Sequence, residues 1–165
     1  MKTKIPLMPI IISSAVIIII LIYVLIIRRR VNISSVKTLS FSYSTGTAMD
    51  ASVSYELVCE TDKCIAKIKP EGTPEEESVK IETTLEIKDK IETILKEYEV
   101  EKWNGFDKND PYVLDGNSFY LNVTMENADS ISASGYMKWP KNYSDFKNNL
   151  DIVFSEILNS QNKDL

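Results

Sequence analysis

The two cysteines of the chain, Cys59 and Cys64, are its clearest candidates for covalent chemistry. Four residues separate them, and apolar residues alternate with polar ones on both sides. If those four residues form a hairpin loop, the cysteines face each other at a Cα separation of about 4.5 to 5.5 Å, which suits a disulfide. Two reduced thiols, or a redox switch without thioredoxin-like spacing, are the alternatives. A zinc site would lack ligands, because the chain has no histidine and no further cysteine.

Oxygen-bearing side chains crowd into the segment W-N-G-F-D-K-N-D-P-Y-V-L-D-G, residues 103–116. In a helix-loop-helix calcium site, a glycine stands at loop position six, but counting from Asp107 puts Tyr112 there. A weak candidate for an irregular calcium site remains, made of Asp107, Asn109, Asp110 and Asp115. The N-G, D-P and D-G steps are typical of turns. We therefore interpret the segment as a chain reversal in which Trp103 and Phe106 are buried anchors.

Aromatic residues recur in G-Y-M-K-W-P-K-N-Y, residues 135–143. An aromatic ring joins a large apolar surface to polar neighbours, which suits carbohydrate or peptide ligands. The candidate ligand patch consists of Tyr136, Trp139 and Tyr143, with Lys138 and Lys141 at its rim. The alternative is a strand-to-helix corner in which Trp139 covers the core.

Most catalytic arrangements lack their residues in this chain. There is no histidine, and no arginine follows Arg30, so Ser-His pairs, Cys-His pairs and arginine phosphate clamps are excluded. Glycoside hydrolysis needs only two carboxylates, but no pair among the 24 acidic residues is singled out by its spacing. The sequence predicts a non-catalytic protein without a cofactor; an envelope hydrolase that uses paired carboxylates is an alternative.

The first thirty residues differ from the rest. No charge occurs between Ile5 and Ile27, and a helix of these residues would be roughly 34 Å long, enough to span a bilayer core of about 30 Å. A cleaved signal peptide would have a shorter apolar core and a small-residue cleavage site. We therefore predict a single-pass anchor within residues 1–30, flanked by Lys2, Lys4, Arg28, Arg29 and Arg30.

The remaining chain is acidic, with 14 lysines against 24 acidic residues after Arg30, a formal charge of −10. Such a domain would be repelled by phosphates, so nucleic acid is not an expected partner. The basic flank at residues 28–30 slightly favours a cytoplasmic domain, as in an accessory subunit of a membrane complex. The cysteine pair and the many Ser, Thr, Asn and Tyr residues favour the opposite side. We expect an extracytoplasmic domain that binds a protein or envelope component.

Hydrophobic periodicity predicts the elements of this domain. Alternation indicates strands at residues 39–44, 53–59, 64–68, 79–81, 119–125 and 131–137. Apolar stripes indicate helices at about 83–99 and 142–157. The expected fold is α+β: an antiparallel sheet of about five to six strands with two amphipathic helices on one face, preceded by a single transmembrane helix. The expected division is anchor 1–30, tether 31–38, globular domain 39–160 and polar tail 161–165.

Four segments of this domain, F-S-Y-S-T-G, V-E-K-W-N-G-F, L-D-G-N-S-F and S-G-Y-M-K-W-P-K-N-Y, resemble segments of small uncharacterised proteins of Gram-positive bacteria. The resemblance covers most of residues 39–154. Many of those proteins look like lipoproteins on the outer face of the membrane, which implies an exported α+β module. The family has no assigned activity, so it supplies no site residue. This chain departs from the pattern because it has an apolar anchor in place of a lipidated cysteine.

Overall fold

The computed structural model describes residues 31–44 and 52–161. The chain divides into two compact units, Met1–Arg30 and Val31–Leu165, and the fold below is that of the second. The predicted anchor, residues 5–27, and its basic flanks lie outside the described residues. No helix within the described ranges is long and apolar enough to cross a membrane.

The elements of the described chain follow one another as strands, a helix, strands and a second helix. The strands are β1 Val36–Ser44, β2 Ser52–Cys59, β3 Cys64–Lys69, β4 Val79–Thr83, β5 Phe106–Asn109, β6 Ser118–Met125 and β7 Ser130–Tyr136. The helices are α2 Leu85–Glu97 and α3 Tyr143–Gln161, and the 3-10 turns are η1 Glu75–Glu77 and η2 Val100–Trp103. The α+β class is confirmed.

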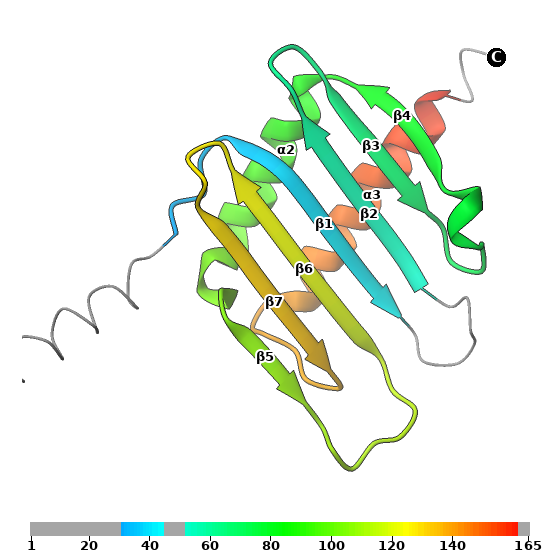
Figure 1. Ribbon diagram of the computed structural model, residues 1–165, viewed down its shortest axis with the longest axis vertical. Coiled ribbons are helices and arrows are strands. Elements are labelled where there is room, and N and C mark those ends of the chain that lie inside the picture. Colours follow the sequence, from blue (N-terminus) through cyan, green and yellow to red (C-terminus); the bar gives the residue numbers. More distant parts are fainter. Residues whose placement is uncertain (1–30, 45–51, 162–165) are drawn as a thin grey trace, which may run out of the picture. The chain divides into compact units, whose positions relative to one another are not determined.

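The predicted sheet is wrong in two respects. Over the described residues the sheet has seven strands in the order β4-β3-β2-β1-β6-β7-β5, and it is mixed, because β5 runs parallel to β7 (Figure 1). The sequence F-D-K-N of β5 contains a single apolar residue, so it carries no alternation that would predict a strand. Its pairing is also non-local: Phe106 pairs with Ala133 and Asn109 with Tyr136.

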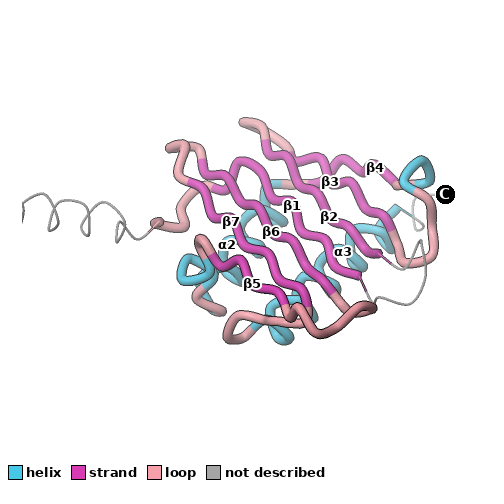
Figure 2. Tube along the Cα trace, turned by 60° about the horizontal axis from the view of Figure 1, so that its bottom comes forward, coloured by secondary structure: helices cyan, strands magenta, loops and turns pink. Residues whose placement is uncertain are grey.

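Both helices pack on the same face of the sheet and enclose the core (Figures 1 and 2). Leu39 and Phe41 of β1 and Leu121 of β6 point into this layer and are at most 1% exposed. The helices contribute Ile87, Ile91, Ile94 and Leu95 from α2 and Phe146, Leu150, Val153, Phe154 and Ile157 from α3. Full burial of each such side chain stabilises the fold by about 1.5–3 kcal/mol.

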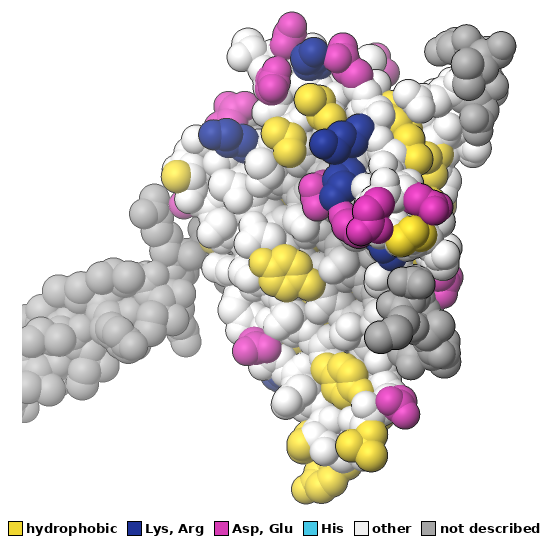
Figure 3. Space-filling view, turned by 45° about the vertical axis from the view of Figure 1, so that its right-hand side comes forward, with side chains coloured by type: hydrophobic (Ala, Val, Ile, Leu, Met, Phe, Trp, Pro, Cys, Tyr) yellow, Lys and Arg dark blue, Asp and Glu magenta, His cyan; other side chains and the backbone are white. Residues whose placement is uncertain are grey.

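The opposite face of the sheet is uncovered in the described structure, and its centre is polar but uncharged. In β1, the residues that alternate with the buried ones are Thr38, Ser40, Ser42 and Ser44. Ser42 pairs with Ser54 of β2 on one side and with Tyr120 of β6 on the other. Figure 3 shows a largely uncharged middle, with charged side chains gathered above it and hydrophobic side chains at the lower tip.

The predicted disulfide is confirmed. Cys59 and Cys64 are in register across β2 and β3, with a Cα–Cα distance of 4.1 Å, and their sulfur atoms are bonded. The intervening turn is closed by the Glu60 N–H, which donates to the Lys63 carbonyl at 2.8 Å. The bond therefore closes the hairpin that the spacing predicted.

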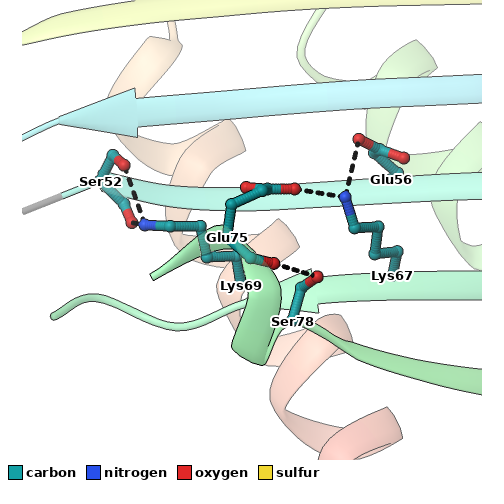
Figure 4. Close-up of polar contacts among 6 residues, drawn as sticks. All are labelled: Ser52, Glu56, Lys67, Lys69, Glu75 and Ser78. Carbon is teal, nitrogen blue, oxygen red and sulfur yellow. Dashed lines mark hydrogen bonds and ion pairs between the residues drawn. The ribbon is translucent and has the colours of Figure 1, made fainter. Parts of the chain in front are cut away.

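Polar contacts fasten the β3–β4 connection to the uncovered face (Figure 4). Lys67 pairs with Glu75 of η1 and holds the pKa of that carboxyl below its usual value. Lys69 is 6% exposed, and its Nζ donates to the carbonyl oxygen of Ser52 at 2.6 Å and to the hydroxyl of Ser52 at 3.0 Å. The Lys67–Glu75 pair thus ties η1 to the sheet, and Lys69 links the end of β3 to the start of β2.

Candidate functional site

A small pocket lies where β7 leads into α3, and we call it the corner pocket. Its volume is about 240 Å³, and the described residues that line it are Tyr98, Glu99, Lys102, Trp103, Phe106, Trp139, Pro140, Lys141 and Asn142. They come from two stretches of chain, 98–106 and 139–142. The parallel pairing of β5 with β7 brings these stretches near each other, and the Trp103 indole N–H joins them by donating to the Lys141 carbonyl.

Trp103 forms the buried wall of the pocket. Its side chain is 3% exposed and packs edge-on against Phe146 of α3, with ring centroids 5.0 Å apart. Its indole N–H donates to the Lys141 carbonyl at 3.1 Å, so its one polar atom is satisfied. Such a residue joins η2 to the start of α3 and fixes the distance between the two sides of the pocket.

Trp139 forms the open wall. Its side chain is 40% exposed, although one ring face stacks on Tyr143 with centroids 4.7 Å apart and an interplanar angle of 24°. Phe119 approaches it at 5.7 Å. Tyr143 itself is buried beneath, and this burial raises the pKa of its hydroxyl. The indole is therefore supported from below and accessible from the solvent side.

Polar groups surround the aromatic walls. Lys102 pairs with Glu99, and the side-chain amide of Asn142 donates to the Tyr98 carbonyl at 3.5 Å. Lys141 is exposed at the rim. Among the described lining residues, Glu99 is the single carboxylate. The pocket thus combines apolar ring surface with a few hydrogen-bonding groups, as small-molecule sites do.

The backbone around the pocket adopts unusual conformations. Among the described residues, positive φ occurs at seven positions, and four of them are here: Glu99 at 56°, Gly105 at 78°, Met137 at 53° and Asn142 at 65°. Glu99 follows the C-cap Tyr98 of α2, a position that usually carries glycine. A side chain there is unfavourable for the backbone, and such conformations cluster at functional sites.

The predicted ligand patch is divided between two places. Trp139 and Lys141 line the corner pocket, and Tyr143 supports it from below. Tyr136 and Lys138 instead contact the loop before β6: the Tyr136 hydroxyl donates to the Leu114 carbonyl at 2.9 Å, and Lys138 pairs with Asp110 at 3.1 Å. The wall from 98–106 was not predicted as part of a site, because non-local contacts, among them the β5–β7 pairing and the Trp103–Lys141 bond, bring it close.

The residues of the weak calcium candidate are engaged with other groups. Asp107 accepts a hydrogen bond from the Ser134 hydroxyl at 2.8 Å. Asp110 accepts one from the Tyr112 N–H at 3.1 Å, and this bond together with Lys138 lowers the pKa of its carboxyl. Within the described part of the chain, no group of three or more acidic or cysteine side chains is placed to hold a metal ion. The four residues, which include Asn109 and Asp115, are not assembled as a site.

No protein-family model matches this chain, and no curated protein matches it.

Proposed function

We propose that this protein is a membrane-anchored binding module that holds an envelope saccharide in the corner pocket. The observation that carries the proposal is the exposed indole of Trp139 above a pocket that has fixed aromatic walls and polar edges. The membrane attachment rests on the charge-free segment 5–27 and its basic flanks.

The extracytoplasmic side is supported by the disulfide between Cys59 and Cys64. Such bonds persist in oxidising compartments and are rare in the cytosol, where thiols are kept reduced. An exported module also agrees with the resemblance to lipoprotein-like proteins of Gram-positive bacteria. The inverted arrangement, a cytoplasmic accessory subunit, would have to maintain this bond in a reducing compartment.

A saccharide suits the chemistry of the pocket. The C–H groups of a sugar ring carry partial positive charge and pack on the negative π-face of an indole. The hydroxyl and amide groups of the sugar can then form hydrogen bonds with side chains such as Asn142, Lys141 and Glu99. A volume of about 240 Å³ lies below the usual range of about 300–1,000 Å³ for drug-sized ligands, so we expect one sugar ring to occupy it.

The pocket favours binding over cleavage. Glycoside hydrolases place two carboxyl groups about 5–5.5 Å or 6.5–9.5 Å apart across the scissile bond. Among the described residues that line this pocket, Glu99 has no second carboxylate opposite it, and it already pairs with Lys102. We therefore propose a non-catalytic role and place the hydrolase alternative second.

Titration calorimetry on the full chain in mild detergent, with an N-acetylglucosamine oligosaccharide as the probe, tests the binding. Trp139→Ala should weaken binding at least tenfold and leave the melting temperature nearly unchanged. The matched control is Tyr120→Ala, which removes a ring that is 44% exposed on the sheet and should leave binding intact. A collapse in stability for Trp139→Ala, or undiminished binding, would contradict the assignment.

The side of the membrane is tested separately. A cysteine placed at the exposed Glu77 should react with a membrane-impermeant maleimide on intact cells. Reaction only after lysis would establish the inverted orientation. A freely soluble product that lacks residues 1–30 would exclude the anchor.

A further inference from the structure

Two large apolar side chains project almost completely into solvent from the loop between β5 and β6. Tyr112 and Leu114 are each 93% exposed, whereas the other exposed large apolar residues of the described chain reach at most 57%. The loop extends beyond the ends of both strands (Figure 1), and apolar side chains mark this tip of the surface in Figure 3. Burial in the domain therefore does not account for these two residues.

The loop is held from beneath by residues at the end of β7. The Tyr136 hydroxyl donates to the Leu114 carbonyl at 2.9 Å, and the Met137 N–H donates to the Asn117 carbonyl at 2.9 Å. The Asp110 carboxylate accepts a hydrogen bond from the Tyr112 N–H at 3.1 Å and pairs with Lys138. A fixed backbone beneath two exposed anchors lowers the ordering entropy that a partner must overcome.

Gly116 shows how closely the loop follows its support. A Cβ atom at this position would lie 2.5 Å from Cγ of Met137 and 3.2 Å from Cζ of Tyr136. Two of the five residues of the predicted ligand patch, Tyr136 and Lys138, thus support this loop. They do not form part of the corner pocket.

The loop and the start of β1 lie at opposite ends of the sheet. The chain enters the domain just before Val36, which pairs with Met125 at one end of the sheet, whereas the loop leads into Ser118 at the other end. The nine residues of β1 separate the two ends by roughly 30 Å. The loop is therefore at the opposite end of the sheet from the first residue of β1.

The charge of the domain argues against an anionic bilayer as the occupant. Residues 31–165 have a formal charge of −10, and Asp107, Asp110 and Asp115, within or beside the loop, outnumber the neighbouring Lys108 and Lys138. Lipid headgroups of the same sign would repel this surface. A protein surface can instead offer basic side chains at the border of an apolar pocket. Tyrosine is also among the residues that most often dominate such contacts.

We propose that loop 110–117 is a docking element for a second protein, whose apolar pocket receives Tyr112 and Leu114 and whose basic border faces Asp115. This interaction surface is separate from the saccharide pocket and does not depend on it.

Photo-crosslinking of the full chain in its own membranes tests the proposal. With benzoylphenylalanine at position 112, we expect one discrete adduct with a different protein. Leu114→Ser should reduce the adduct at least tenfold, and Asp115→Lys should reduce it several-fold. The matched control, Tyr120→Ser, should leave it unchanged, and the same crosslinker at position 120 should give no such adduct.

Each other outcome overturns the proposal. An adduct with lipid would make the loop a membrane contact, and an adduct with twice the mass of the chain would make it a self-association surface. If no adduct forms, or if its yield is unchanged by Leu114→Ser, the loop is not a docking element. An adduct yield that is unchanged by Asp115→Lys would contradict the proposed basic border of the partner's pocket. Because Leu114 is 93% exposed, an unchanged melting temperature should accompany Leu114→Ser.

Discussion

The two tryptophans line the same pocket, but the protein uses them differently. Trp103 is 3% exposed and its indole N–H is bonded within the domain, whereas Trp139 is 40% exposed above a supporting tyrosine. Each tryptophan directly follows a lysine in the sequence, Lys102 or Lys138. Burial, and not residue type, separates the ring that builds the pocket from the ring that is available to a ligand.

The largest expected effect is the loss of stability when the buried tryptophan, Trp103, is replaced. Trp103→Ala should lower the free energy of unfolding by about 3–5 kcal/mol, because it leaves a cavity beside Phe146 and removes the bond to the Lys141 carbonyl. Chemical denaturation of the full chain in detergent measures this change. The same measurement on Trp139→Ala is the matched control and should show about 1 kcal/mol or less. Equal losses for the two variants would remove the distinction between them.

A smaller effect is expected at Glu99, where two substitutions distinguish backbone strain from the loss of the carboxylate. Glu99→Gly and Glu99→Ala both remove the carboxylate, but only glycine relieves the positive φ of 56°. The glycine variant should be the more stable of the two by about 1 kcal/mol. Because Glu99 lines the pocket, both variants should bind the saccharide probe more weakly than the native chain. Equal stability would show that this backbone conformation is not strained.

The smallest expected effect is a local pH response in the docking loop. The Tyr112 N–H and Lys138 hold the pKa of Asp110 below its ordinary value of 3.8. Because the folded-state pKa is depressed, the stabilisation is complete above the unfolded pKa and is lost as the pH falls through the folded value. The Tyr112 amide resonance in an NMR titration should therefore shift with a midpoint below pH 3.8. A midpoint at or above 3.8 would contradict the fixed loop.

The sequence predicted the elements whose information is local. Alternation on either side of Cys59 and Cys64 indicated the β2–β3 hairpin and its disulfide, and the stripe from Ile87 to Leu95 indicated α2. It did not predict β5, because a strand with one apolar residue is stabilised by pairing with a segment 27 residues away in the chain. The pocket depends on that pairing, so local sequence patterns could predict only one of the two stretches that line it, residues 139–142.

The period of β7 would have separated two residues of the predicted patch. The alternation of β7 places Ile131, Ala133 and Gly135 on the buried face, so Tyr136 had to point to the other face, away from Trp139. The predicted patch joined Tyr136 and Trp139 because they are close in sequence. Their separate positions, Tyr136 beneath loop 110–117 and Trp139 at the corner pocket, agree with the period of the strand.

Single-tryptophan fluorescence tests the central claim most directly. In the Trp103→Phe variant of the full chain, Trp139 is the only reporter, and we expect acrylamide to quench it and the N-acetylglucosamine oligosaccharide to protect it. In Trp139→Phe, Trp103 should be quenched weakly and should not respond to the oligosaccharide. If the oligosaccharide leaves the quenching of Trp139 unchanged, the corner pocket is not the saccharide site and the proposed function is wrong.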